Sequence, residues 1–276
     1  MINQYLPKKA KIISIKQETE DVKLFRLKFV KDQEYFYFWH GQFAQIGLPG
    51  YGEGPFDICS NSNVSTKYFE ISVRKVGFLT SKLHKLKKND YIYVRGPFGK
   101  GWPEPKTLAK KNLLLVGGGC GFVPLKSIIE EVSGGYSMSH KVQVFYGCSD
   151  ENNVLFKDSY GKWLDNDIDL RLIFDKKKPS NNHIQGISCS FGLITKLFDS
   201  VKVVEDASAF LCGPPIMFKF VVAKLLKQGF KEEDIYVSME RKMYCATGVC
   251  QHCAMGEKYV CKDGPVFNYP EVKNYI

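Results

Sequence analysis

Apolar and polar positions alternate with a period of two through most of residues 1–105, a pattern typical of half-buried strands. These runs are rich in β-branched and aromatic residues, and Gly, Asn and Pro separate them. Short strands at this spacing predict a closed barrel or a sandwich, and we favour an antiparallel β-barrel. One stretch, 79–86, has helical spacing instead. The expected strands are 9–19, 22–30, 43–48, 68–76 and 91–98.

Beyond residue 106 the pattern changes, and apolar strands alternate with amphipathic helices as far as residue 238. Such alternation predicts a parallel sheet with helices on both faces. A short cysteine-rich module, 239–276, follows this α/β domain. The α/β domain should begin with a strand, a glycine turn and a helix within residues 112–132. Further strands are expected within 141–150, 170–175, 208–214 and 234–239. Further helices are expected within 190–201 and 215–229.

The glycine turn reads GGGCGFVP and joins the first strand of the α/β domain to its helix. Its glycines permit a tight turn and a close approach to a pyrophosphate, and the helix N-terminus beyond offers free N–H groups. Pro124 suits the first turn of that helix. The pattern favours a dinucleotide site, and a tight turn without a ligand is the alternative. The glycines are Gly117, Gly118, Gly119 and Gly121.

Three strands of the expected parallel sheet end in small residues, namely Gly117, Gly147 and Cys212. Ligands of open α/β sheets bind at the carboxyl ends of the strands, so these residues should share one edge. Cys212 opens the motif CGPPIM, in which Gly213 and Pro214 lead into the next helix. Cys212 is therefore either a small core residue or part of the nucleotide site.

Charge and hydropathy exclude several classes of function. The formal net charge is +10, but the lysine runs are scattered and no stacking aromatics interleave them, so no nucleic-acid site is expected. No apolar run approaches the ~20 residues that span a bilayer, and the N-terminus lacks the apolar core of a signal peptide. We expect a cytoplasmic protein without membrane insertion, in a reducing compartment where clustered cysteines bind metals.

Four cysteines lie close together near the C-terminus. Cys245, Cys250 and Cys253 follow the plant-type iron–sulfur spacing C-x4-C-x2-C, and Cys261 completes a set of four thiolates. Zinc sites usually pair two C-x2–4-C knuckles, but here the second half has one cysteine, so zinc and disulfides are the less favoured alternatives. The remaining cysteines are isolated, and we expect no second cluster and no catalytic thiol among them.

Along the chain a β-barrel is followed by GGGxGxxP, then CGPPxM, then the four-cysteine tail. This order resembles the ferredoxin–NADP reductase superfamily over nearly the whole chain. Within it, the chain is similar to electron-transfer subunits with a C-terminal [2Fe–2S] module. LPGYGEGPFDICS, RKVGFLTSKL and YVCKDGPVFNY look most like the electron-transfer subunit of anaerobic sulfite reductase and the gamma subunit of sulfhydrogenases. The electron-transfer subunit of dihydroorotate dehydrogenase, with a longer gap before its last cysteine, is the third candidate.

The resemblance implies FAD in the barrel. The strand that holds the flavin in the family corresponds here to GPFDIC. Gly54 stands where the family has an arginine and Asp57 where it has a hydroxyl, and Arg74 is expected to supply the missing positive charge. The loop 95–102 is expected on the flavin side. The implied flavin contacts are Pro55, Phe56, Asp57, Ile58, Arg74, Gly77 and Thr80.

The resemblance also implies NAD(P)H bound across 117–121, with its nicotinamide near Cys212, and a [2Fe–2S] cluster as the outlet for electrons. Hydride transfer between cofactors needs no general base, so no catalytic residue is expected. Asp150 and Glu151 would repel a 2′-phosphate, whereas Lys176 to Lys178 would attract one. We favour NADH over NADPH.

The sequence contains no sign of a siroheme, nickel or orotate site, so the terminal reaction should lie in other subunits of a redox complex. We expect a catalytic subunit there, and a ferredoxin-like subunit is a further candidate. A dissimilatory or anaerobic sulfite reductase is favoured, a sulfhydrogenase or hydrogenase is the alternative, and dihydroorotate dehydrogenase ranks third. The alternative that is not an enzyme is a metal-binding sensor on a degenerate reductase fold.

Overall fold

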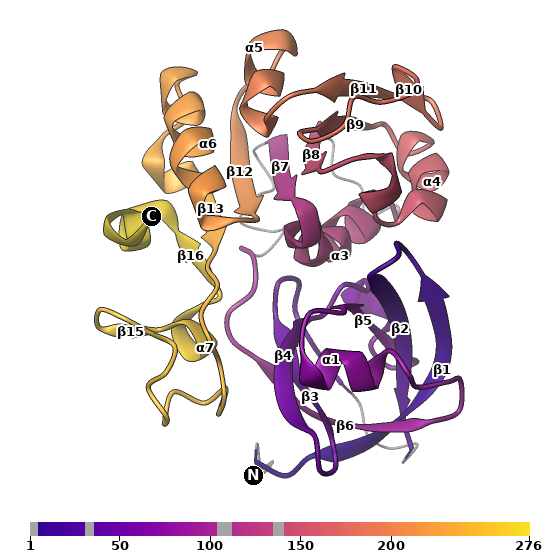
Figure 1. Ribbon diagram of the computed structural model, residues 1–276. Helices are drawn as coiled ribbons and strands as arrows, with labels where there is room; N and C mark the ends of the chain where they lie inside the picture. The colour runs from indigo at the N-terminus through magenta and orange to yellow at the C-terminus, as the bar shows by residue number, and fades with distance from the viewer. Residues whose placement is uncertain (1–4, 31–35, 104–111, 135–140) are drawn as a thin grey trace.

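The computed structural model describes residues 5–30, 36–103, 112–134 and 141–276. Within them an antiparallel sheet with strand order β4-β3-β6-β1-β2-β5 forms the N-terminal domain (Figure 1). A bridge between Ile58, just after β4, and Ile71 in β5 joins the two outer strands, so the sheet closes into the predicted barrel. The strands are β1 (Lys8–Gln17), β2 (Val22–Phe29), β3 (Phe43–Leu48), β4 (Gly52–Asp57), β5 (Phe69–Arg74) and β6 (Tyr91–Phe98).

Strand β4 has no counterpart among the strands expected from periodicity, although the family resemblance implies a strand at GPFDIC. Its sequence GEGPFD has two glycines, a proline and two acids, which carry little β-propensity. Pairing with β3 in the register Phe43 with Asp57 to Leu48 with Gly52 forms the strand nevertheless. The expected helix 79–86 is α1 (Phe78–Leu83) and ends three residues earlier.

The second sheet has the order β10-β11-β9-β8-β7-β12-β13-β16, and its strands from β11 to β13 are parallel. This confirms the predicted α/β domain. Its described strands are β7 (Asn112–Gly118), β8 (Val142–Cys148), β9 (Ile168–Phe174), β10 (His183–Ile184), β11 (Ile187–Phe191), β12 (Ala207–Cys212), β13 (Ile235–Ser238) and β16 (Val266–Asn268). The helices are α3 (Val123–Val132), α4 (Tyr160–Leu164), α5 (Leu197–Ser200) and α6 (Pro215–Lys227).

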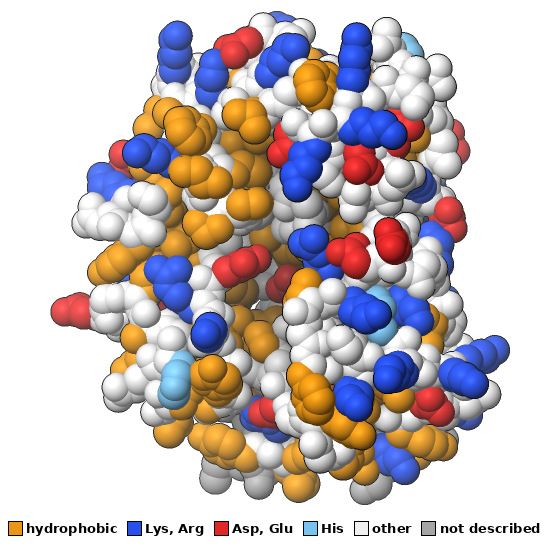
Figure 2. All heavy atoms as spheres, in the orientation of Figure 1, with side chains coloured by type: hydrophobic (Ala, Val, Ile, Leu, Met, Phe, Trp, Pro, Cys, Tyr) orange, Lys and Arg blue, Asp and Glu red, His pale blue; other side chains and the backbone are white. Residues whose placement is uncertain are grey.

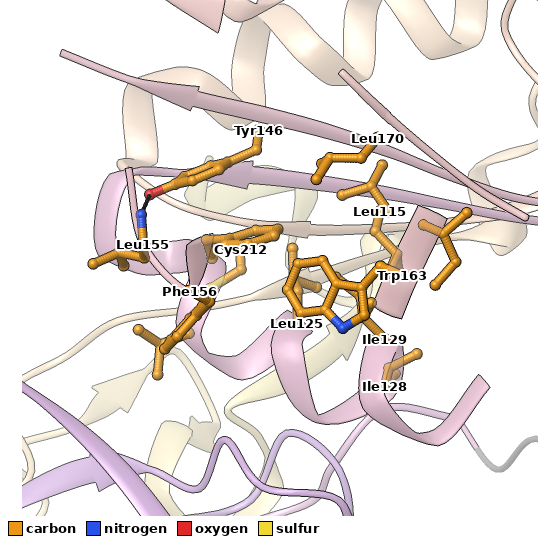
Figure 3. Packing of buried hydrophobic residues seen from close by; sticks show 14 of the residues in the cluster. Leu115, Leu125, Ile128, Ile129, Tyr146, Leu155, Phe156, Trp163, Leu170 and Cys212 are labelled. Carbon is orange, nitrogen blue, oxygen red and sulfur yellow. Dashed lines mark hydrogen bonds between the residues drawn. The ribbon is translucent and has the colours of Figure 1, made fainter. Parts of the chain in front are cut away.

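Helices cover both faces of this sheet because successive strand residues point to opposite sides. Leu115 and Leu170 pack with α3 and α4 on one face, as Figure 3 shows. Leu114 and Phe145 pack with α5 and α6 on the other. The expected helix 190–201 is correct in its second part and wrong at its start. Residues 190 and 191 belong to β11, and Gly192 has a positive φ of 134° that no helix allows, whereas a 3-10 turn over Ile194–Lys196 leads into α5.

The C-terminal module is not separated from the α/β domain by a simple boundary. It contains β14 (Ala254–Met255), β15 (Lys258–Tyr259), α7 (Val260–Asp263), β16 and α8 (Tyr269–Val272). β16 joins the large sheet as an antiparallel edge strand beside β13. The backbone of Lys100, after β6, also donates to Gly264, so the module contacts both domains. The expected boundary between barrel and α/β domain, at residues 105 and 106, lies outside the described residues.

Buried polar contacts hold the barrel against α3. Lys126 is 5% exposed, and its Nζ lies 3.3 Å from Glu70 Oε2 in β5 and 3.4 Å from the carbonyl oxygen of Cys59. Trp102, at the end of the barrel, donates from Nε1 to the carbonyl of Pro124 and stacks on Phe210 with ring centroids 4.8 Å apart. Because a buried ammonium without its partner is costly, these contacts favour one relative placement of the two domains.

Candidate functional site

A cavity of about 490 Å³ opens at the carboxyl ends of β7, β8 and β9. Four residues expected at the nucleotide site line it: Gly118, Gly119, Gly147 and Pro214. Gly119 has a positive φ of 56°, which lets the chain turn from β7 toward α3. The volume lies within the usual range of cofactor sites. The other lining residues on this side include Cys148, Ser149, Asn153, Ile173, Asp175, Lys176, Ile216 and Phe220.

Gly117, Gly121 and Gly213 serve packing and do not line this cavity. A Cβ on Gly121 would lie 2.5 Å from the backbone carbonyl carbon and oxygen of Cys212. A Cβ on Gly213 would lie 3.1 Å from the backbone of Gly118. The turn after β7 and the turn after β12 therefore touch backbone to backbone. Pro124 is buried behind them in the first turn of α3.

Cys212 is buried in the apolar layer under the cavity rather than at its wall. It belongs to the same buried cluster as Tyr146 and Phe156, which Figure 3 shows, and its exposed fraction is 3%. Burial raises the pKa of the Cys212 thiol well above its ordinary value. The thiol therefore stays protonated at neutral pH and behaves as a small core side chain.

A second cavity, of about 530 Å³, lies between β4, β5 and the start of α1. Pro55, Phe56, Asp57, Arg74, Gly77 and Thr80 line it, as expected for the flavin site. Ile58 does not, because its side chain is fully buried in the barrel core. The Thr80 Oγ1 accepts hydrogen bonds from the backbone N–H groups of Val76 and Gly77, at 3.0 and 2.9 Å. The hydroxyl of Thr80 thus shapes the start of α1.

The two cavities meet at Arg74 and Cys120, which line both. Arg74 Nε donates to Asp21 Oδ2 at 2.6 Å, and this hydrogen bond raises the pKa of the guanidinium. Figure 2 shows the surface hollowed between the two halves of the molecule, with acidic side chains at the edge. A ligand in one cavity can therefore approach a ligand in the other across Arg74.

Three carboxyl groups line the second cavity, and two of them, Asp57 and Glu240, have raised pKa values. Burial and the nearby charge of Glu240 raise the pKa of Asp57 to about 7. Burial raises the pKa of Glu240 as well. Near neutral pH Asp57 can therefore carry a proton and donate a hydrogen bond to a bound molecule.

Replacing Asp57 with asparagine should remove a pH-dependent loss of stability. The folded-state pKa lies above the ordinary value of 3.8, so the folded state binds the proton more tightly and wild-type stability falls as pH rises from about 4 to 7. The variant should match wild type near pH 4 and exceed it in stability by up to about 4 kcal/mol at pH 8. Urea unfolding at both pH values measures this, with flavin content recorded by absorbance. An equal difference at both pH values would contradict it.

The four cysteines of the C-terminal module lie on a tightly wound loop and on α7. Ala246, Gly248 and Gln251 have positive φ values of 63°, 80° and 62°. Such conformations strain the two non-glycine residues and are kept where the surroundings require them. They turn backbone N–H groups inward. Those of Thr247 and Cys250 both donate to Cys245 Sγ at 3.4 Å.

The Cys245 thiol interacts with Cys250, and the Cys261 thiol interacts with Cys253 and also with Cys245. Burial acts to raise the pKa of Cys245, but the hydrogen bonds from Cys250 and Thr247 outweigh it and lower that pKa to about 6. Among the described residues no group of three or more His, Cys, Asp or Glu is placed to hold a metal ion. Four mutually interacting thiols fit a two-iron cluster, in which four thiolates bind two irons.

Several lining residues were missed by the sequence analysis. Thr19 and Asp21 come from the turn before β2, and 192–195 follow β11, where no motif marks them. Glu240 follows β13 and could have been found by the rule that ligands bind beyond the carboxyl ends of strands. Asp150 and Glu151 do not line the nucleotide cavity. In the part of the chain that the structure describes, no helix has the length and apolar character to cross a membrane.

Models of known families match all three parts of the chain. Residues 9–102 match the oxidoreductase FAD-binding domain, and 115–223 match the oxidoreductase NAD-binding domain. Residues 240–273 match the iron–sulfur cluster binding domain of dihydroorotate dehydrogenase B. The protein thus has FAD-, NAD- and iron–sulfur-binding domains.

Similar proteins cover the chain almost end to end. Sulfhydrogenase 2 subunit gamma of Pyrococcus furiosus is 36% identical over 97% of this chain and 96% of its own length. A probable dihydroorotate dehydrogenase B electron transfer subunit of the same organism is 31% identical over 95% and 92%. The structure of an NADH-dependent reduced ferredoxin–NADP oxidoreductase matches with a TM-score of 0.74 and 25% identity, over 95% of this chain and 88% of that one. The chain therefore belongs to the family of FAD-, NAD- and iron–sulfur-binding electron-transfer subunits with the ferredoxin–NADP reductase fold.

Proposed function

We propose that the chain oxidises NADH in the 490 Å³ cavity, reduces FAD in the 530 Å³ cavity and delivers single electrons through the cysteine loop to a partner subunit. The observation that carries this proposal is that both cavities share Arg74 and Cys120, so the two ligands can meet. Bound FAD supplies the exchange between hydride and single electrons, and the cluster accepts electrons one at a time.

The residues of this chain orient the groups and need not take part in bond making. Gly118, Gly119 and Pro214 would hold the dinucleotide against the first turn of α3. Arg74, between the cavities, would offset the negative charge of both cofactors. Cys245, Cys250, Cys253 and Cys261 would bind the iron ions. Their main-chain N–H donors would stabilise thiolate charge.

Anaerobic absorption spectra of the purified protein test the proposal. A flavin band with broad iron–sulfur absorption, both bleached by NADH, is the expected result. A protein that shows the flavin band but no iron–sulfur absorption would contradict the proposed electron transfer through the cysteine loop. A colourless protein that contains zinc would contradict it and would favour the metal-binding sensor.

The proposed preference for NADH over NADPH rests on Asp175 and not on Asp150 and Glu151, which were expected from the sequence. The Asp150 carboxylate caps its own turn by accepting from Asn152 N at 2.8 Å, and Glu151 accepts from the hydroxyl of Ser180 at 3.3 Å. Asp175, just after β9, does line the nucleotide cavity, together with Lys176. A carboxylate there would accept a hydrogen bond from a ribose hydroxyl and would repel a 2′-phosphate.

Replacing Asp175 with asparagine should improve the use of NADPH. Loss of the negative charge beside Lys176 should raise the ratio of kcat/KM for NADPH to that for NADH about tenfold. Steady-state diaphorase assays with both nucleotides measure the ratio. Asp150→Asn is the matched control, because Asp150 lies outside the cavity, and an equal effect of both variants would contradict the assignment.

The proposal also includes the identity of the catalytic subunit that receives the electrons. Sequence motifs favour a dissimilatory or anaerobic sulfite reductase, whereas the identity to two Pyrococcus furiosus sulfhydrogenase gamma subunits, 36% and 34%, favours a hydrogenase. We propose one of these two as the catalytic subunit. Affinity purification of the tagged chain from its native cells, followed by assays for sulfite reduction and for hydrogen uptake, distinguishes them.

A further inference from the structure

A buried arginine of the barrel contacts the first cysteine of the cluster loop. The Arg95 side chain, in β6, is 6% exposed. Both of its terminal nitrogens, Nη1 and Nη2, lie 3.3 Å from the carbonyl oxygen of Cys245. The two residues are 150 positions apart in the sequence, so tertiary folding alone brings them together.

A neighbouring amide extends this contact along the loop. Gln45 of β3 faces Arg95 across the strand pair. Its Nε2 donates to the carbonyl oxygens of Met243 and Tyr244 at 3.4 and 3.5 Å. Three successive carbonyl groups at the start of the cluster loop therefore accept hydrogen bonds from the barrel.

The same guanidinium is paired on its other side with an acid of the flavin cavity. Arg95 Nε donates to Glu53 Oε2 at 3.0 Å, and Arg95 Nη2 contacts Glu53 Oε1. Glu53 lines the 530 Å³ cavity. Contacts thus run from the flavin cavity through Glu53 and Arg95 to Cys245, and two opposite charges lie close to the cluster loop.

We propose that the Arg95–Glu53 pair positions Cys245 and sets the reduction potential of the iron–sulfur cluster. The inference rests on the proposed role of Cys245 as a cluster ligand. Reduction adds one negative charge to a cluster, so a nearby cation makes reduction easier and a nearby anion makes it harder. The two partners therefore act in opposite directions, and the potential depends on the balance between them.

The test compares Arg95→Gln and Glu53→Gln in redox titrations of the purified holoprotein, followed by the EPR signal of the reduced cluster. Arg95→Gln leaves the Glu53 carboxylate uncompensated and should lower the midpoint potential by about 59 mV, a tenfold shift in a one-electron equilibrium. Glu53→Gln should raise it by a similar amount, and the double variant should lie between. Arg171→Gln, which breaks an ion pair with Asp169 in the α/β domain, should leave the potential unchanged.

Shifts of the same sign in both variants, or no shift in either, would overturn the inference, because a tether without an electrostatic role loosens the loop alike in both. If the Arg95→Gln variant does not retain its cluster, the Glu53→Gln variant alone tests the inference: a raised midpoint potential supports it, and a lowered or unchanged one contradicts it. A wild-type protein without an iron–sulfur EPR signal would instead contradict the proposed function. Failure of the proposed function can therefore be distinguished from failure of this inference.

Discussion

Replacing Cys250 with serine should abolish the iron–sulfur absorption and EPR signal while the flavin remains reducible by NADH. The Cys250 thiol interacts with that of Cys245, so the substitution removes one of the four thiols proposed to bind the cluster and retains the backbone N–H that donates to Cys245 Sγ. Changes beyond the ligands themselves already weaken metal sites 10–100-fold. We expect electron delivery to a one-electron protein acceptor to fall at least ~100-fold. NADH-dependent bleaching of the flavin band should change by less than about twofold, because both cavities lie outside the loop.

The control is Cys189→Ala, which removes a buried cysteine of β11 that belongs to neither cavity nor the loop. Its cluster spectrum should match that of wild type. A Cys250→Ser protein that keeps the full spectrum would show that Cys250 is not a ligand. A variant that also loses flavin reduction would show that the cluster module supports the flavin cavity.

Replacing Gly121 with alanine should destabilise the protein and weaken NADH binding. The added Cβ would lie 2.5 Å from three backbone atoms of Cys212 and Gly213, and backbone cannot move aside as the end of a side chain can. Overpacking of this kind costs about 3 kcal/mol. Thermal unfolding should begin roughly 6–10 °C lower. The KM for NADH should rise because the turns that carry Gly118 and Pro214 are forced apart.

Gly161→Ala is the matched control. Gly161 lies in α4, and a Cβ there would meet no atom within 4 Å. Alanine in a helix favours the folded state by about 0.5–1 kcal/mol relative to glycine. The control should therefore unfold at an equal or higher temperature, with an unchanged KM. Equal losses in both variants would mean that the close approach at Gly121 does not matter.

The sequence predicted well wherever a function depends on local chain geometry. The glycine turn and the strand-to-helix order place Gly118 and Gly119 at the edge of the sheet, because a strand end and a helix start are local features. The cysteine spacing likewise predicted a cluster loop. Periodicity missed β4 and the end of β11 at 190–191, where pairing with β3 and with β9 overrides weak or misleading local preferences.

By itself, the sequence determined the order of barrel, α/β domain and cysteine module, and with it the set of cofactors. The tertiary structure alone decided which side chains meet. It buried Cys212 in the core, brought Arg74 to the junction of the two cavities, and joined Arg95 to Cys245 across 150 positions. Periodicity and motifs report how a segment folds locally. Contacts between distant segments depend on how whole sheets pack, and no short stretch of sequence encodes that packing.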